Sequence, residues 1–194
     1  METVTLSIVV PVYAGAAYLE SLVVAVEELR RVWEAEEFPV SIIELILVDD
    51  SAVDDSPELI DNLARDNPRL VALHLSRNYG QHSATIAGIL HSSGEWVVTL
   101  DEDLQHPPER ISMLLELAVS RSVDVVYANP ASAAVHGAFW RDGSSRGFKT
   151  FMGWVTGNRN LRLVNSFRLV RGPIARAASS VCTHNTYLDI ALFW

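Results

Sequence analysis

Apolar runs and segments of helical periodicity alternate along the first two thirds of this chain. Five predominantly apolar runs have the length of buried strands: Leu6–Val12, Ser41–Val48, Leu70–Leu75, Trp96–Leu100 and Asp124–Ala128. The segments between them predict helices over Tyr18–Glu36, from Ser56-Pro57 onward, over Gln81–His91 and over Pro107–Arg121. This order predicts an α/β fold, with a mostly parallel sheet covered by helices on both faces.

Length and composition are those of a globular protein. The 194 residues are 49% hydrophobic and 20% charged, with neither an internal repeat nor a linker, so we expect one domain over residues 1–194. Cys182 is the only cysteine, which excludes an intramolecular disulfide and favours a reducing, cytoplasmic compartment. The acid at Glu2 is unlike a secretory signal, and Pro11 and Gly15 make the uncharged stretch 3–19 a poor membrane span.

Charge is spread unevenly along the chain. The net charge of −9 argues against nucleic acid as a partner. Residues 1–66 hold fifteen acids and three arginines, whereas residues 141–171 hold seven bases and one acid. The basic segment is either a solvated face or a surface for phosphates or anionic lipid headgroups. It overlaps a long Ala/Ser/Gly-rich loop predicted for residues 129–147, a kind of loop that is commonly functional.

Polar residues follow three of the predicted strands. Tyr13 comes after the first, Asp49 and Asp50 end the second, and the acids 101–103 follow the fourth. Open parallel sheets bind ligands at the carboxyl ends of their strands, so we expect these side chains to converge on one edge.

The three consecutive acids predict a metal site. Adjacent carboxylates repel one another, and a divalent cation such as Mg²⁺ or Mn²⁺ offsets that repulsion with carboxylate ligands and substrate phosphates. In an extended segment Asp101 and Asp103 point to one side, and Gln105 shares their parity. A solvated acidic turn that caps the next helix is the alternative. Neither a Gly-rich dinucleotide-binding motif nor a P-loop follows the first strand. The remaining way to bind the phosphates of a ligand is through a metal ion that bridges a diphosphate.

Five ordered motifs carry a family resemblance. They are PVY at 11–13, LVDDSAVDDS at 47–56, LSRNYGQHSATIAG at 75–88, LDEDLQHPPE at 100–109 and SFRLVRGP at 166–173. Together they resemble the family 2 inverting glycosyltransferases of GT-A fold. Within that family the chain looks most like the polyprenyl-phosphate sugar transferases, the group of dolichol-phosphate-mannose synthase and the undecaprenyl-phosphate glycosyltransferases.

The resemblance implies a metal-dependent, inverting transfer of a sugar from a nucleoside-diphosphate sugar to a polyprenyl phosphate. It also implies roles for single residues. Pro11 and Tyr13 would line the nucleotide base, and Asp49 and Asp50 would contact base and ribose. The metal that bridges the diphosphate would be held by Asp101, Asp103 and Gln105, with Asp103 essential for transfer. Arg168 would reach the phosphates from the acceptor side.

Three departures from the family pattern stand out. Ala14-Gly15 replace the usual Asn-Glu after PVY, which would remove a polar contact near the nucleotide. Asn165 stands where many relatives carry aspartate or glycine. Relatives run on through amphipathic or transmembrane helices, whereas this chain stops at Trp194, so we expect it to be truncated relative to the family.

Several alternatives stay open from sequence. A sugar or protein hydroxyl acceptor would need a general base, for which Asp189 is the candidate, unless it is only a first-turn acid of an apolar helix. A nucleotidyltransferase also uses strand-end aspartates. It usually has a basic, Gly-rich loop after the first strand, and this chain lacks such a loop. The departures at Ala14 and Asn165 would also be compatible with a catalytically inactive nucleotide-binding scaffold.

An amphipathic helix is predicted beside the basic segment. Arg146 and Lys149 flank an apolar stretch, 148–155, that contains Phe148, Phe151 and Trp154. A buried helix would explain the aromatic residues alone. A helix at a membrane surface explains aromatic residues and bases together, so we expect contact with the anionic cytoplasmic face of a membrane.

Overall fold

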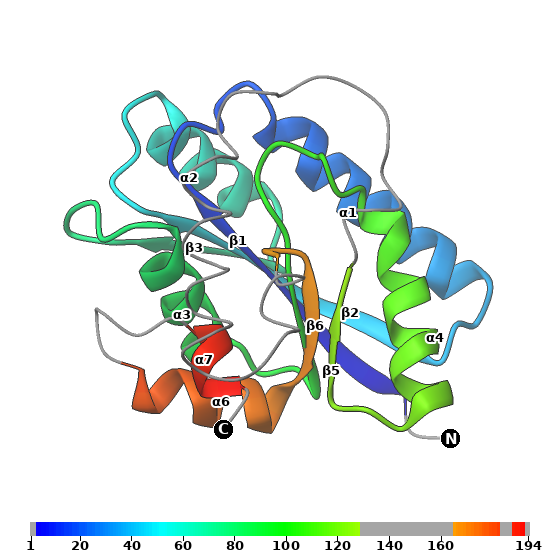
Figure 1. Cartoon of the computed structure of the whole chain (residues 1–194). Coiled ribbons are helices and arrows are strands. Elements are labelled where there is room, and N and C mark those ends of the chain that lie inside the picture. Colours follow the sequence, from blue (N-terminus) through cyan, green and yellow to red (C-terminus); the bar gives the residue numbers. More distant parts are fainter. Residues whose placement is uncertain (1–2, 129–164, 183–187, 193–194) are drawn as a thin grey trace.

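The computed structural model describes residues 3–128, 165–182 and 188–192 (Figure 1). The strands are β1 Val4–Val12, β2 Val40–Asp49, β3 Leu70–His74, β4 Trp96–Thr99, β5 Val125–Tyr127 and β6 Arg168–Arg171. The helices are α1 Leu19–Ala35, α2 Ser56–Asp66, α3 Gln81–His91, α4 Ile111–Arg121, α6 Gly172–Val181 and α7 Leu188–Leu192, with a 3₁₀ turn η1 at Pro108–Arg110. The five predicted strands and four predicted helices are all present, within a few residues of their expected bounds.

The sheet is mostly parallel, as predicted. Within the described ranges the strand order is β3-β2-β1-β4-β6-β5, and β1 to β4 run parallel to one another. β6, which the apolar pattern did not predict, runs antiparallel to both β4 and β5. Because of that reversal, Arg168 at the start of β6 pairs with Thr99 at the end of β4. The start of β6 therefore lies at the edge where the parallel strands end.

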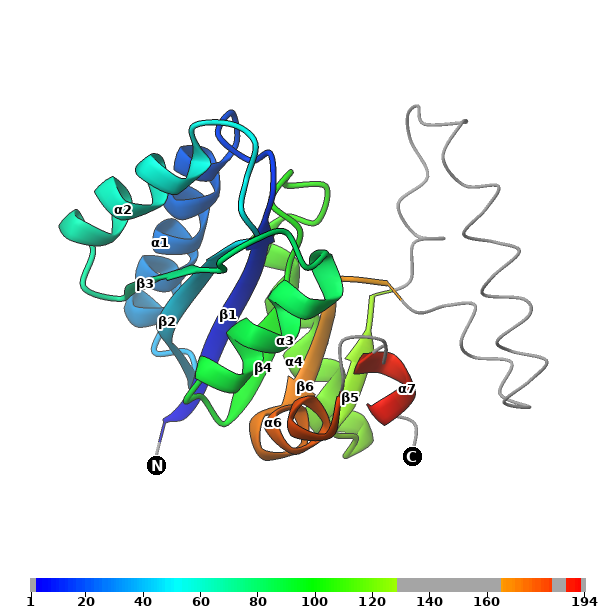
Figure 2. The ribbon, with the colours of Figure 1, turned by 90° about the vertical axis from the view of Figure 1, so that its left-hand side faces the viewer.

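Helices cover both faces of the sheet (Figure 2). On one face, α1, α2 and α4 bury a large core against alternate residues of the central strands, such as Ile8 and Val10 of β1. On the other face, α3, α6 and α7 pack against the intervening residues, such as Val9. A Cβ at Gly88 of α3 would lie 2.4 Å from Val9 Cγ1, so this helix rests directly on β1. The strands that carry the site are thus fixed from both sides.

The segment predicted as one helix from Pro107 is divided. Pro107 has φ −67° and ψ 140°, because a residue that precedes a proline is driven out of the helical region. A 3₁₀ turn follows, and the regular helix α4 begins only at Ile111. Among the described residues no helix combines the length and apolar character that crossing a membrane requires.

Candidate functional site at the carboxyl edge of the sheet

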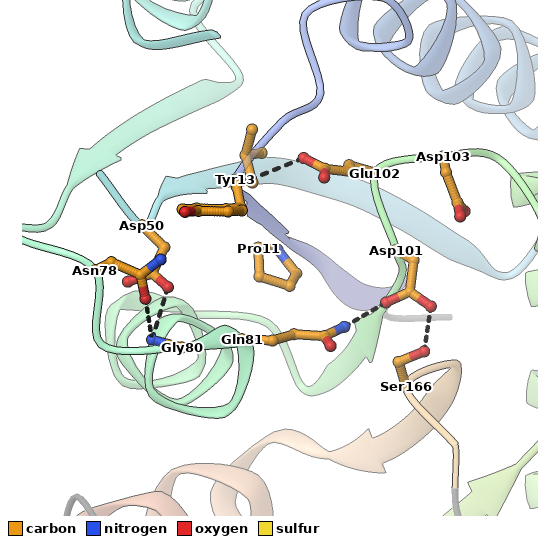
Figure 3. Close-up of a pocket in the computed structure, with 11 residues that line it drawn as sticks. Pro11, Tyr13, Asp50, Asn78, Gly80, Gln81, Asp101, Glu102, Asp103 and Ser166 are labelled. Atoms are coloured by element: carbon orange, nitrogen blue, oxygen red, sulfur yellow. Dashed lines mark hydrogen bonds between the residues drawn. The ribbon is translucent and has the colours of Figure 1, made fainter. Parts of the chain in front are cut away.

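A cavity of about 530 Å³ opens where β1, β2 and β4 end (Figure 3). It is lined by residues from these strand ends, from the segment before α3 and from the turn before β6: Pro11, Val12, Tyr13, Asp50, Asn78, Gly80, Gln81, Asp101, Glu102, Asp103 and Ser166. Its size is that of a site for a small organic ligand. The expected convergence of strand-end residues on one edge is therefore confirmed for Tyr13, Asp50 and the acids 101–103.

The aromatic side of the cavity comes from β1. Pro11 lies in the strand, and Tyr13 follows it with 44% of its surface exposed. The carbonyl of Tyr13 accepts a hydrogen bond from the N–H of Val53 at 3.1 Å, and its own N–H donates to Glu102 at 3.0 Å. The backbone is thereby held on both sides, while the ring projects into the cavity (Figure 3).

The two aspartates at the end of β2 diverge. Asp50 lines the cavity and accepts the N–H groups of Tyr79 and Gly80, both at 2.7 Å, so it holds the segment that leads into α3. Asp49 is buried and bonds elsewhere, to the N–H of Ala52 at 2.7 Å and to His74 Nδ1 at 2.9 Å. Asp49 is not among the residues that line the cavity, and its predicted nucleotide contact stays a prediction.

Two aspartates after β4 face the same cavity. One oxygen of Asp101 accepts a hydrogen bond from Gln81 Nε2 at 2.6 Å, and the other accepts one from the hydroxyl of Ser166. Asp103 Oδ1 accepts the N–H of Gln105 at 3.1 Å. Both donors to Asp101 are neutral, so its negative charge is not cancelled by them.

The expectation that this segment is extended is wrong. The strand ends at Thr99, the chain turns over residues 102–106, and Leu104 has a left-handed φ of 58°. Alternation of side chains holds only in extended backbone. Gln105 is accordingly exposed and is not among the residues that line the cavity.

The acidic side of the cavity is rich in negative charge. Of the described residues that line it, none is a lysine or an arginine. Burial raises the pKa of the Glu102 carboxyl, hydrogen bonds from the N–H groups of Tyr13 and Ala14 oppose that rise, and the nearby Asp54 and Asp103 add to it. Within the described ranges no three His, Cys, Asp or Glu side chains are grouped to hold a metal. The two cavity-facing aspartates, which meet no lysine or arginine among the described lining residues, still fit Mg²⁺ or Mn²⁺, which commonly rest on one or two carboxylates and substrate phosphates.

The structure brings two predicted catalytic residues together outside the cavity. Arg168 is 3% exposed, and its guanidinium donates a hydrogen bond to Asp189, in the first turn of α7. The hydroxyl of Tyr127 donates to the same carboxylate oxygen at 2.9 Å. Burial, and then the adjacent Asp189, raise the pKa of the Tyr127 phenol. The phosphate contact predicted for Arg168 stays a prediction, because its side chain faces Asp189 here.

Sequence reasoning missed several residues that line the cavity. Asn78, Gly80 and Gln81 precede or begin α3, and Gln81 reaches across to Asp101. Gly80 has φ 89°, a left-handed conformation that suits glycine and turns the chain into the helix. A glycine directly before a predicted helix was the available signal.

An α/β sheet with a ligand cavity and a pair of strand-end aspartates at its carboxyl edge is the arrangement expected of the GT-A fold. The profile of Glycosyl transferase family 2 matches residues 7–176. The chain belongs to this family, as its motifs indicated.

Known proteins resemble the chain in sequence. The chain is 43% identical over 127 residues to "Undecaprenyl-phosphate 4-deoxy-4-formamido-L-arabinose transferase" of Sodalis glossinidius, an alignment that covers 65% of this chain and 37% of that protein. The chain thus spans about a third of the length of the curated relatives it matches.

Solved structures support the fold. The crystal structure of S. aureus TarS in complex with UDP superposes with a TM-score of 0.65 at 16% identity, over 97% of this chain and 54% of that one. Glucosyl-3-phosphoglycerate synthase from Mycobacterium tuberculosis, in complex with Mn²⁺, UDP and phosphoglyceric acid, gives 0.58 at 17% identity, over 89% and 57%.

Proposed function

We propose that this chain transfers a sugar from a nucleoside-diphosphate sugar to a polyprenyl phosphate, with inversion and with a divalent cation. The observation that carries the proposal is the cavity itself, in which Pro11 and Tyr13 lie opposite Asp101 and Asp103. An aromatic surface at one end suits a nucleotide base. A pair of carboxylates at the other end suits the metal that accompanies a diphosphate.

The donor would lie along the strand ends. Pro11 and Tyr13 would contact the base, and Asp50 would support the segment of Asn78 and Gly80 beside it. Asp101 and Asp103 would hold Mg²⁺ or Mn²⁺. When bound, such an ion supplies Lewis-acid stabilisation of the leaving nucleoside diphosphate. Two solved proteins of similar fold are complexed with UDP, one of them also with Mn²⁺, which supports this assignment.

A phosphate acceptor is favoured over a hydroxyl acceptor by two observations. The relatives that match at 43% and 46% identity are named undecaprenyl-phosphate transferases. A hydroxyl acceptor needs a general base, and the candidate Asp189 is buried and engaged by Arg168 and Tyr127. A lipid phosphate is already anionic at neutral pH and needs no such base. The proposed place of action is the cytoplasmic face of the membrane that holds this lipid.

Binding and transfer assays test the proposal. Thermal unfolding of the purified chain is followed with UDP, GDP and dTDP, each with and without Mn²⁺, and we expect at least one nucleotide to stabilise it only with the metal. Transfer from the matching sugar nucleotide to undecaprenyl phosphate and to free sugars is then measured. Stabilisation by a nucleotide without transfer to any acceptor would favour the inactive nucleotide-binding scaffold. No response to any nucleotide would contradict the proposal, and transfer to free sugars alone would favour the hydroxyl acceptor.

A further inference from the structure

The middle acid of the 101–103 segment contacts the opposite side of the cavity. Glu102 Oε2 accepts the N–H of Tyr13 at 3.0 Å, and Glu102 Oε1 accepts the N–H of Ala14 at 3.3 Å. Each of its oxygens therefore takes one backbone donor from the segment that follows β1. Hydrogen bonds to a charged acceptor are among the stronger ones in proteins. The side chain joins the turn after β4 to the turn after β1.

Gly15 leaves room for this carboxylate. A Cβ built at Gly15 would lie 2.5 Å from Glu102 Oε2 and 3.2 Å from Glu102 Cδ. Among the described glycines a left-handed φ occurs only at Gly80, so the backbone at Gly15 does not itself require glycine. The nearest reason for a glycine here is the Glu102 side chain.

The backbone at Gly15 is held in place by hydrogen bonds on both sides. The N–H of Gly15 donates to Ser56 Oγ at 3.1 Å. Its carbonyl accepts the N–H groups of Tyr18 at 2.7 Å and Leu19 at 3.0 Å, at the start of α1. A side chain at this position would therefore displace Glu102 rather than move the turn.

We propose that Glu102 is a positioning residue, which holds the base-side Tyr13 at a fixed separation from Asp101 and Asp103, and that Gly15 is small to admit its carboxylate. The positioning role rests on the proposed function, because it requires a nucleotide diphosphate in the cavity. It also bears on the departure at Ala14-Gly15: the N–H groups of Tyr13 and Ala14 donate to a carboxylate from the turn after β4, for which Gly15 leaves space. A ligand that contacts both the base side and the metal side of the cavity binds more tightly when the distance between these two sides is already fixed.

A double-mutant cycle tests the coupling between the two residues. The variants are Gly15→Ala, Glu102→Ala and the two combined, and the free energy of unfolding is measured by urea titration. We expect Gly15→Ala to destabilise the wild type and to have much less effect in the Glu102→Ala background. The contact of the new Cβ with Val12 Cγ1, at 3.2 Å, is common to both backgrounds and cancels. If Gly15→Ala changes the free energy of unfolding equally in both backgrounds, the proposal that Gly15 is small to admit the Glu102 carboxylate is wrong.

Ligand fragments test the positioning role. The affinity of the nucleotide, whichever of UDP, GDP and dTDP binds the wild type with Mn²⁺, is measured by calorimetry. The affinities of two fragments, pyrophosphate with Mn²⁺ and the free nucleoside, are measured by competition with that nucleotide. We expect Glu102→Ala to weaken the whole nucleotide by about tenfold while both fragments bind as before. Glu102→Gln, which keeps an acceptor oxygen, should recover part of the loss. Glu109→Ala removes an exposed acid outside the cavity and serves as the control.

The outcomes separate the two proposals. If wild type binds a nucleotide and Glu102→Ala binds it equally well, the positioning role is wrong and the proposed function stands. If Glu102→Ala weakens both fragments as much as the whole nucleotide, Glu102 shapes the fold and does not align the two ends. If no nucleotide binds wild type, the proposed function and the positioning role are both wrong. The double-mutant cycle still decides whether the Glu102 side chain is the reason that position 15 is a glycine.

Discussion

The guanidinium of Arg168 donates a hydrogen bond to the carboxylate of Asp189, and both side chains are buried. The two residues come from β6 and α7, and Tyr127 of β5 donates to the same carboxylate. One buried nitrogen of the guanidinium, Nε of Arg168, has no hydrogen-bond partner within residues 3–128, 165–182 and 188–192. The charges of two residues that the sequence marked as catalytic thus compensate each other.

Removing one member of this pair should destabilise the protein. Asp189→Ala leaves the Arg168 charge buried and unpaired, so we expect the free energy of unfolding to fall by about 3–5 kcal/mol. The double variant Arg168→Met/Asp189→Leu buries no charge and should lose much less. Urea titration measures both. The exposed pair of Arg171 and Asp124, with side chains 48% and 50% exposed, is the control, and Asp124→Ala should cost at most about 1 kcal/mol. If Asp189→Ala is as mild as the control, the buried pair contributes little.

Asp103→Ala should abolish sugar transfer without unfolding the chain. Asp103 lies in the turn after β4 and outside the core, so its loss removes a metal ligand and little packing. Turnover is measured with Mn²⁺ present, and circular dichroism checks the fold. Asp55→Ala, which removes an exposed acid outside the cavity, is the matched control. Near-wild-type turnover of Asp103→Ala would show that this residue holds no essential metal.

Asp101→Asn should weaken nucleotide binding mainly through the metal. The amide retains an oxygen that can accept from Gln81 or Ser166, so the local contacts are partly kept while the charge is lost. Raising the Mn²⁺ concentration should therefore restore part of the affinity. Calorimetric titration of the nucleotide at several Mn²⁺ concentrations measures this effect. A loss of affinity that no concentration of Mn²⁺ relieves would speak against a ligand role.

The stability of the fold should depend on the protonation of His74. The hydrogen bond with Asp49 raises its pKa above the ordinary value of 6.5, desolvation opposes that rise, and Asp61 adds to it. Since the folded state holds the proton more tightly, this stabilisation is fully present below the ordinary pKa. It is lost as pH rises through the raised value.

Unfolding of wild type and His74→Asn from about pH 6 to about pH 9 tests this dependence. Wild type should lose stability relative to the variant as pH rises. Asp61→Asn should keep more of the raised His74 pKa than Asp49→Asn, because the bond with Asp49 is the largest cause. Parallel stability curves for wild type and His74→Asn would rule out the linkage.

The basic segment should bind anionic membranes. Arg146, Lys149 and the apolar stretch 148–155 lie outside the described residues, so this prediction rests on sequence. Each base near anionic lipid contributes about 1 kcal/mol, which predicts reversible, salt-sensitive binding. Sedimentation with anionic and neutral vesicles at two salt concentrations is the measurement, with Arg146→Glu/Lys149→Glu as the comparison. If wild type ignores anionic vesicles at low salt, unaided docking is wrong and a hydroxyl acceptor gains support.

The sequence by itself determined the order of strands and helices over residues 4–127 and the edge at which the site lies. Both follow from local properties: hydrophobic periodicity reports which face of an element is buried, and parallel strands end on one side. Tyr13, Asp50 and the acids 101–103 could therefore be assigned to one site before any contact was known. The same reasoning did not reach β6, a run of four residues that includes Arg168 and Arg171.

Only the tertiary structure decided where individual side chains point. Asp49 and Asp50 are neighbours, yet one bonds His74 and the other the turn before α3. The backbone is left-handed at Leu104, and Gln105 is exposed and not among the residues that line the cavity; no periodicity encodes such a torsion. The contact of Glu102 with Tyr13 joins residues 89 positions apart. Side chains in turns follow backbone torsions and long-range partners, both of which exist only once the chain has folded.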